Sequence, residues 1–236
     1  MIKPGKLYLM PVPISDDAPL FHIPPANMDI AKKLHFFVAE DAKTARRNLK
    51  LFGYAPLEKA HILLLNEHSK AEETGLLLEP LLNGNDVGLM SDAGCPGIAD
   101  PGAALVELAH KRGIEVVPLS GPSSIVLSIM ASGFNGQNFA FNGYLPVDKM
   151  QRQKRIRELE QLALKQRQAQ FFIETPYRNV QMMEALISTL AKQTKLYLGI
   201  CIGSASQKLL SRTVAEWQKT GAPALNKLPV VFGIYA

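Results

Sequence analysis

Short apolar runs alternate with longer amphipathic stretches through the first half of the chain. Five runs have the length and apolar character of buried strands: "KLYLMPVPI", "HFFVAE", "HILLLN", "DVGLM" and "IEVVPLS". The stretches between them predict helices at 28–34, 41–53, 69–84 and 101–113. Strands that alternate with helices are typical of a parallel sheet covered on both faces. We therefore predict an α/β fold whose first domain has a mostly parallel sheet with helices on both faces.

The pattern changes after the fifth of these runs, because strand-like runs then follow one another more directly. Helices are predicted at 125–133, 149–167 and 177–191, and the strand-like runs are "NFAFNGYLP", "AQFFIE", "KLYLGICIG", "QKLLSRT" and "LPVVFGIYA". Fewer helices separate these strands, so the second sheet is predicted to be mixed. We therefore expect two α/β domains, at 1–119 and 120–236.

Composition and charge narrow the class of protein only slightly. The chain has 236 residues, 47% of them hydrophobic, and a formal net charge of +5. No apolar run is long enough to span a membrane, and the first residues lack the features of a signal peptide. The two cysteines, Cys95 and Cys201, have no partners at metal-ligand spacing. We expect a reduced, cytoplasmic protein without a metal or a membrane segment, whose mild basic charge suits nucleic acid or acidic metabolites.

Four junctions that follow predicted strands carry unusual residues. They are "MPVPISDD", "AEDAKTARR", "SDAGCPGIADPG" and "SGPSS". In an open parallel sheet, ligands bind beyond the carboxyl ends of the strands. One such loop is usually only a turn with capping residues, but four at one edge of a sheet predict a ligand site there.

The third of these junctions is rich in glycine and proline, which allow the main chain to approach a ligand closely and keep it stiff. Asp92 is placed to accept hydrogen bonds from ligand hydroxyls or an amine, and Asp100 is expected to cap the helix that follows. The loop matches neither GxGxxG nor GxxxxGK[ST], so it suits a ligand read by the main chain without a pyrophosphate. Cys95 has two interpretations, a nucleophile or a small side chain packed against the ligand. The second is favoured because the nearest histidine in sequence, His110, lies in a predicted helix.

The other junctions also allow two interpretations. The amides of "SGPSS" open a helix and either bind a carboxylate or are capped by Ser120 or Ser123. Asp41 is expected to be a helix N-cap, which leaves Glu40 as a candidate acid or base. The basic stretches "KTARRNLK" and 149–167 are either solvated faces or contacts for a phosphate backbone.

These segments together resemble the tetrapyrrole methylase family of S-adenosylmethionine-dependent methyltransferases, and most closely its small-subunit ribosomal RNA (cytidine-2′-O)-methyltransferase branch. The motifs that carry the resemblance are "KLYLMPVPI", "AEDAKTARRNLKLFG", "VGLMSDAGCPGIADPG", "VVPLSGPSSIVLSIMASG", "FNGYLP" and "FFIETPYR". The resemblance implies a class III methyltransferase fold with S-adenosylmethionine in the cleft between the two domains. It also implies a homodimer, an RNA of the small ribosomal subunit as partner, and no metal.

The resemblance assigns candidate residues to each role. The residues implied in donor binding are Pro11, Pro13, Asp92, Cys95, Pro96, Gly97, Ser123, Ser124, Ile173, Cys201 and Ile202. Glu40 is our candidate for the base that receives the proton of a ribose hydroxyl. Arg46, Arg47 and Arg178 are candidates for binding phosphate.

Two departures from the branch keep other functions open. The chain reads "VPISD" where the branch has "TPIGN", and "CIGSASQKLLSRTVAEW" where the branch carries "RELTK" and an acidic pair. The alternatives are methylation of a tetrapyrrole or another small molecule, and a module that binds the donor or RNA without catalysis. A hydrolase with Cys95 as nucleophile is a further alternative.

Overall fold

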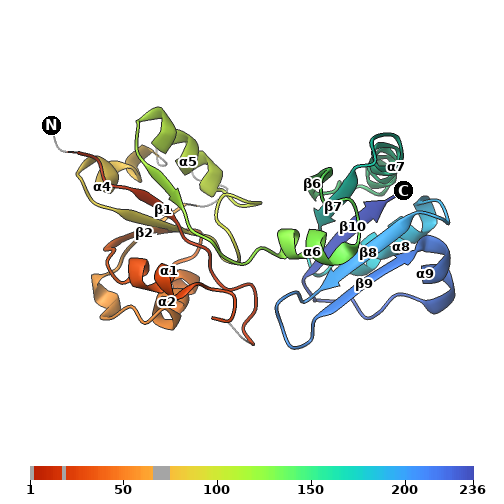
Figure 1. Cartoon of the computed structure of the whole chain (residues 1–236), viewed down its shortest axis with the longest axis horizontal. Coiled ribbons are helices and arrows are strands. Elements are labelled where there is room, and N and C mark those ends of the chain that lie inside the picture. Colours follow the sequence, from red (N-terminus) through yellow and green to blue (C-terminus); the bar gives the residue numbers. More distant parts are fainter. Residues whose placement is uncertain (1–2, 18–19, 66–74) are drawn as a thin grey trace. The chain divides into compact units, whose positions relative to one another are not determined.

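The computed structural model describes residues 3–17, 20–65 and 75–236. The chain divides into two compact units, residues 1–123 and 124–236, which are called unit 1 and unit 2 here. Each unit has its own five-stranded sheet and its own helices (Figure 1).

The sheet of unit 1 is entirely parallel, with the strand order β3-β2-β4-β1-β5. Its strands are β1 (Leu7–Leu9), β2 (Phe36–Ala39), β3 (His61–Leu64), β4 (Val87–Met90) and β5 (Val116–Pro118). The helices with described bounds are α1 (Pro25–Ala31), α2 (Ala42–Leu51), the short 3-10 helix η1 (Leu57–Lys59), α4 (Glu79–Leu82) and α5 (Gly102–Lys111). Helices α1 and α2 lie on one face of the sheet, and α4 and α5 lie on the other (Figure 1). The predicted parallel sheet with two covered faces is confirmed.

The alternation of side chains along β2 shows how both faces are buried. Phe37 and Ala39 belong to the core beneath α1 and α2, whereas Val38 belongs to the core beneath α4 and α5. Successive residues of a strand point to opposite faces, so a strand buried on both sides needs an unbroken apolar run. This requirement explains why the strands of unit 1 read as continuous apolar segments.

The structure describes only part of the helix predicted at 69–84. Residues 69–74 of that stretch lie outside the described residues, Gly75 and Leu76 are helical, and the helix that follows is α4, at Glu79–Leu82. A turn at Leu77 and Leu78 interrupts the helical backbone before it. Pro80 explains the break, because its ring clashes with the carbonyl of the residue four positions earlier when a helix continues through it.

The sheet of unit 2 is mixed, with the strand order β6-β7-β10-β8-β9. Its strands are β6 (Phe139–Tyr144), β7 (Ala169–Ile173), β8 (Lys195–Ile200), β9 (Lys208–Thr213) and β10 (Val230–Tyr235). Only β6 and β7 pair in parallel, and the other neighbours are antiparallel. The helices are α6 (Ser124–Ser132), α7 (Lys149–Gln166), α8 (Asn179–Thr189) and α9 (Val214–Thr220). The predicted mixed sheet is confirmed.

The two faces of this second sheet are covered differently. Side chains of α7, α8 and α9 form one large core with strand residues such as Phe172, Leu198 and Phe232. On the opposite face, Phe134 contacts the rings of Phe171 and Tyr197. Helix α6 packs against β8, β9 and β10 on this side.

Among the helices that the structure describes, none combines the length and apolar character needed to cross a bilayer.

Candidate functional site

The loops after β1 and β4 are joined by main-chain hydrogen bonds at the carboxyl edge of the sheet of unit 1. The amide of Val12 donates to the carbonyl of Gly94 at 2.9 Å, and the amide of Gly94 donates back to Val12 at 3.2 Å. Gly94 has a φ of 77°, a conformation that glycine adopts without steric cost. Two junctions that the sequence placed at one edge of the sheet are therefore in direct contact.

The loop after β5 packs onto the same place. A Cβ atom on Gly121 would lie 2.2 Å from Cβ of Pro11, so the proline ring rests directly on the glycine main chain. The thiol of Cys95 lies 3.3 Å from the carbonyl oxygen of Pro122, to which it donates. The loops after β1, β4 and β5 thus form one assembly, which we call the rim.

Side chains within the third junction brace its shape. Oδ1 of Asp100 accepts hydrogen bonds from the amide of Gly97 at 2.6 Å and from the amide of Gly102, the first residue of α5, at 2.8 Å. The second bond satisfies the amide of the first residue of α5, although the N-cap position is Pro101 and not Asp100 as expected. The hydroxyl of Ser91 donates to the carbonyls of Ala93 and Gly94. The loop is therefore held in shape by its own groups.

Gly97 and Pro96 lie within this braced loop. Gly97 has a φ of 81°, and a Cβ atom built on it would meet no other atom within 4 Å. The space beside its main chain is therefore open, whereas Pro96 is buried. An open glycine in a stiff loop is the arrangement expected where a ligand approaches the main chain.

Asp92 lies at the exposed end of β4, close to the loop after β2. Its pKa is raised from an ordinary value of 3.8, first by desolvation and then by the negative charge of Asp41, while Arg47 acts in the opposite direction. These influences place the Asp92 carboxylate among charged groups of the β2 junction. The group is placed to accept hydrogen bonds from a hydroxyl or an amine.

The β2 junction begins with Glu40 and leads into α2. Asp41 is the N-cap of that helix, because its Oδ1 accepts a hydrogen bond of 2.7 Å from the amide of Thr44, as predicted. Glu40 is half-buried, and Arg46 is exposed. Arg47 forms an ion pair of 3.2 Å with Asp16, which belongs to the loop after β1. This ion pair connects the junction after β2 with the loop after β1.

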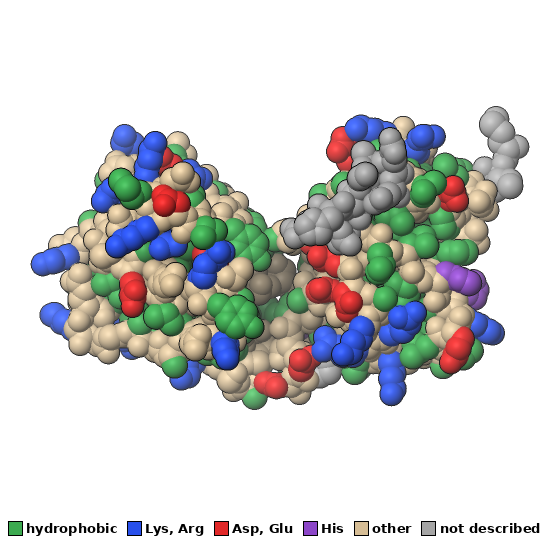
Figure 2. All heavy atoms as spheres, turned by 180° about the vertical axis from the view of Figure 1, so that it is seen from behind, with side chains coloured by type: hydrophobic (Ala, Val, Ile, Leu, Met, Phe, Trp, Pro, Cys, Tyr) green, Lys and Arg blue, Asp and Glu red, His purple; other side chains and the backbone are tan. Residues whose placement is uncertain are grey.

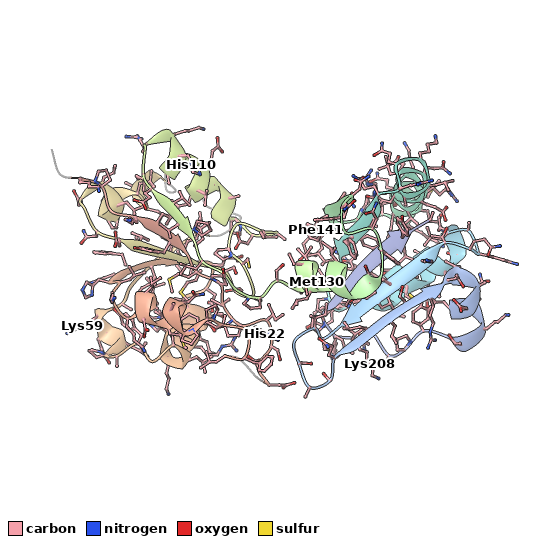
Figure 3. The ribbon with its side chains drawn as sticks, viewed as in Figure 1. His22, Lys59, His110, Met130, Phe141 and Lys208 are labelled. Carbon is pink, nitrogen blue, oxygen red and sulfur yellow. The ribbon has the colours of Figure 1, made fainter. Side chains whose placement is uncertain are left out.

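The environment of Cys95 argues against a nucleophilic thiolate. Burial raises the pKa of its thiol from 9.0, and the thiol donates to a carbonyl instead of to a base. His110 is an exposed residue of α5 (Figure 3). A reactive cysteine has a lowered pKa and a neighbouring base. The structure therefore favours packing over catalysis for this side chain.

In unit 2, the candidate donor residues lie at the ends of β7 and β8. Ile173 ends β7 and is half-buried, while Cys201 and Ile202 follow β8 and are buried. Cys201 has a φ of 49°, and its amide donates to the carbonyl of Pro229 at 3.0 Å. Cδ1 of Ile202 lies so near Gly199 that a Cβ there would be only 2.6 Å away. The loop is therefore fixed against the sheet.

Arg178 is engaged in a buried ion pair at the end of β7. Its Nη2 donates to Oε1 of Glu174 at 2.7 Å and its Nε at 3.0 Å, and the same oxygen accepts from the amide of Thr175 at 2.6 Å. The side chain of Glu174 is 0% exposed and that of Arg178 is 30% exposed. Arg178, a predicted phosphate ligand, is thus first of all the partner of a buried carboxylate.

Ser123 and Ser124 lie where unit 1 ends and unit 2 begins. Ser123 is buried, and Ser124 is the first residue of α6. The neighbouring Ser120 accepts a hydrogen bond of 2.8 Å on its carbonyl from the side chain of Asn27 in α1. The fourth junction is therefore tied to a helix of unit 1.

The described residues fit an adenosyl ligand better than a metal ion. No three His, Cys, Asp or Glu side chains of the described part of the chain come together in a group that could hold a metal. The open main chain at Gly97, the half-buried thiol of Cys95 and the carboxylate of Asp92 offer polar and apolar contacts without phosphate-binding cations at the same loop. This donor set is the one expected for a nucleoside without a pyrophosphate.

Sequence reasoning missed the residues that hold the rim together. The sequence patterns predicted neither the bridge between Val12 and Gly94 nor the contact between Pro11 and Gly121. The bridge uses main-chain groups, which leave no signal in side-chain identity. A stiff "PVP" segment opposite a glycine-rich loop is a weak signal of such a contact.

No family model matches the chain. Proteins named ribosomal RNA small subunit methyltransferase I are similar to it. The one from Haemophilus influenzae is 30% identical over 90% of this chain and 72% of its own length, and the one from Pseudomonas aeruginosa is 29% identical over 90% and 71%. The one from Vibrio cholerae is 28% identical over 89% of this chain and 69% of its own length.

A solved structure described as that of the methyltransferase CobJ has a TM-score of 0.65 and 16% sequence identity, and the match covers 98% of this chain and 94% of that one. This likeness shows that the fold is shared. It agrees with the class III methyltransferase fold that the motifs implied. Because a relative is 30% identical and this chain covers 72% of it, the chain belongs to the ribosomal RNA small subunit methyltransferase I family of S-adenosylmethionine-dependent methyltransferases.

Proposed function

We propose that this chain transfers a methyl group from S-adenosylmethionine to a ribose 2′-hydroxyl in the RNA of the small ribosomal subunit. The observation that carries the proposal is the similarity to named ribosomal RNA small subunit methyltransferases over about nine tenths of the chain. The braced rim of unit 1 supports it, since that loop assembly suits a donor read by the main chain. The protein would act in the cytoplasm as a homodimer.

The donor would be held by residues of both units. Those of unit 1 are Pro11, Pro13, Asp92, Cys95, Pro96, Gly97 and Ser123, and those of unit 2 are Ser124, Ile173, Cys201 and Ile202. When bound, S-adenosylmethionine supplies a methyl group made electrophilic by its sulfonium.

The remaining chemistry falls to side chains at the β2 junction. A ribose hydroxyl is a weak nucleophile, so Glu40 receives its proton as the new bond forms. Arg46 and Arg47 bind phosphates beside the reacting ribose, and Arg178 contributes from unit 2. The rim aligns acceptor and donor, because a methyl transfer needs its reacting atoms about 3 Å apart and in line.

The acceptor is tested by incubating the full chain with labelled S-adenosylmethionine and either small ribosomal subunits or a porphyrinogen. We expect label in ribosomal RNA, and digestion of that RNA should give a 2′-O-methylated nucleoside. Label only in the porphyrinogen would assign the small-molecule alternative. Binding of the donor without any transfer would assign a non-catalytic module.

The role of Glu40 is tested by Glu40→Gln, with Glu58→Gln on the exposed η1 as the matched control. General base catalysis contributes on the order of 100- to 10,000-fold, so kcat should fall at least 100-fold in the first variant. Donor affinity, measured by calorimetry, should stay unchanged in both. An unchanged kcat in Glu40→Gln would remove this residue from the mechanism.

A further inference from the structure

The two units carry opposite net charges. Unit 2 has 14 Lys and Arg residues against 6 Asp and Glu, a formal charge of +8, and unit 1 has 12 against 15, a charge of −3. In Figure 2, the unit without grey residues shows many more blue than red side chains on the face drawn. The mild net charge of the whole chain therefore hides a strongly basic unit.

Helix α7 carries the largest group of these cations and sorts them into two sets. The first set is structural. Arg152 is 7% exposed and donates to the carbonyl of Val147 at 3.1 Å. Arg155 donates to Oδ1 of Asn142 at 3.1 Å and pairs with Glu158 at 3.1 Å. Both arginines therefore bind groups of their own unit.

The second set faces solvent and consists of Lys154, Arg157 and Lys165, while Lys149, in the first turn, is also exposed but lies outside this set. Within the part of the chain that the structure describes, none of the three makes an ion pair. Arg157 and Lys165 lie three and eleven positions after Lys154, a spacing that puts all three on one stripe of an α-helix. The stripe rises about 16 Å along the helix axis.

Among the residues that the structure describes, the two acidic residues of α7 form no ion pair with this stripe, because each has another partner. Glu158 accepts from Arg155, as above. Oε1 of Glu160 accepts from the amide of Ala191 at 2.8 Å and from the hydroxyl of Thr194. Glu158 therefore pairs within α7, Glu160 ties α7 to the segment after α8, and in the described part of the chain neither forms an ion pair with the three cations of the stripe.

The end of α7 is also fixed. The side-chain amide of Asn138 donates to the carbonyl of Gln166, and that of Asn135 donates to the carbonyl of Arg167, both at 2.8 Å. Arg167 ends the helix with a φ of 50° and is exposed. A rigid scaffold loses less entropy when its side chains bind a partner. The stripe is therefore presented on a preorganised surface.

We propose that the stripe Lys154, Arg157 and Lys165 binds phosphates of the RNA substrate at a position outside the methyl-transfer site. The inference rests on the proposed function for the identity of the partner. Three exposed cations along a rigid helix complement a polyanion that carries a charge on every nucleotide. The stripe raises the affinity for RNA and takes no part in the chemical step.

The test compares Lys154→Gln/Arg157→Gln/Lys165→Gln with a control of equal charge loss, Lys33→Gln/Lys59→Gln/Lys219→Gln. Lys33 and Lys59 are exposed and precede β2 and β3, at the edge of the sheet opposite to the rim, and Lys219 is exposed on α9. RNA binding is measured against salt concentration with protein-free RNA of the small subunit. Methyl transfer to that RNA and donor affinity are measured on the same samples.

We expect the stripe variant to raise KM for RNA about tenfold at 0.15 M salt, with kcat and donor affinity unchanged. Its plot of log affinity against log salt should be shallower by about 2 to 3, since each phosphate contact contributes ~0.7–0.9. The control should stay close to the parent. Equal losses in the control, or a stripe variant that matches the parent, would overturn the proposal.

Two further outcomes separate this proposal from the proposed function. If the parent protein binds RNA without methylating it and the stripe variant still shows the shallower slope, the docking surface stands and the proposed reaction fails. If the variant loses affinity for intact small subunits but not for protein-free RNA, the stripe docks on a protein and our proposal is wrong.

Discussion

The loops at the edges of the two sheets are held in place by different kinds of contact. In unit 1, the loops of the rim are joined to one another by the main-chain bridge between Val12 and Gly94 and by the contact of the Pro11 ring with Gly121, and short side chains such as Asp100 brace one loop from within. In unit 2, side chains hold the end of β7, through the buried pair of Glu174 and Arg178. The difference teaches that a loop braced by main-chain and short side-chain contacts leaves the space beside Gly97 open for a ligand, whereas a buried ion pair mainly secures the fold.

The largest expected effect is the loss of the buried pair in unit 2. Arg178→Met leaves the fully buried Glu174 carboxylate without its cation, and breaking such a pair costs about 3 kcal/mol of unfolding free energy. Urea denaturation measures it. Arg157→Met, at an exposed arginine of α7, is the control and should cost less than about 0.5 kcal/mol.

A second variant sharpens this test. Adding Glu174→Gln to Arg178→Met removes the buried charge, so most of the lost stability should return. If Arg178→Met is as stable as the parent and only loses activity on RNA, Arg178 serves the substrate and the contrast between the units weakens.

The next effect concerns the rim of unit 1. Gly121→Ala puts a Cβ atom 2.2 Å from Pro11, and relief of that overlap must move one of the loops. Overpacking of this kind costs about 2 kcal/mol, and donor affinity should fall at least tenfold. Gly136→Ala has open space around the new Cβ and is the control. Normal donor binding by Gly121→Ala would show that the rim does not position the ligand.

Asp92→Asn should lower donor affinity about 10- to 100-fold, because a hydrogen bond to a charged group contributes ~1.5–3 kcal/mol. In the parent protein, affinity should fall as the pH drops through the raised pKa of Asp92, and calorimetry across pH measures this. Donor affinity of the parent that is constant down to pH 3.8, the ordinary value, would contradict the assignment.

Asp92→Asn should weaken donor binding, but it should raise the free energy of unfolding. The fold raises the pKa of Asp92, so it disfavours the ionised carboxylate that is present at neutral pH. Asp92→Asn should therefore be slightly more stable than the parent at pH 7. The gain should vanish below pH 3.8, where the carboxyl is protonated in both the folded and the unfolded chain.

The smallest effect is expected for Cys95→Ser. A hydroxyl can donate to the carbonyl of Pro122 as the thiol does, so methyl transfer should change less than about threefold. Steady-state rates with saturating donor measure this. A loss of 100-fold or more would restore the interpretation of Cys95 as a nucleophile.

Sequence patterns predicted the architecture well where local chemistry sets it. Continuous apolar runs gave the doubly covered sheet of unit 1, and the N-cap Asp41 was predicted from its position before a helical pattern. Helix α9 was missed although Thr213 and Glu216 form a capping box at its start. That signal was present in the sequence, but the helix is short and directly follows the strand β9 without an intervening turn.

The candidate site was predicted less completely, for a physical reason. The sequence indicated which loops carry special residues, but contacts such as those of Gly121 with Pro11 depend on strand order, which the patterns did not define. The pairing of Arg178 with Glu174 was also missed. An arginine looks the same in sequence whether it faces a phosphate or a buried carboxylate, and only the burial of Glu174 distinguishes the two.

The bridge between Val12 and Gly94 has a consequence for how quickly the protein can work. Loops that are ordered only by their ligand must fold around it and open again in every cycle, and such motions often limit turnover. With the donor bound at the rim as proposed, a rim that is paired beforehand would skip this step, and the methylated product and the spent donor would leave without local unfolding. Slow deuterium uptake at the amides of Val12 and Gly94 in the free protein would show that the two loops are already paired before the ligand binds.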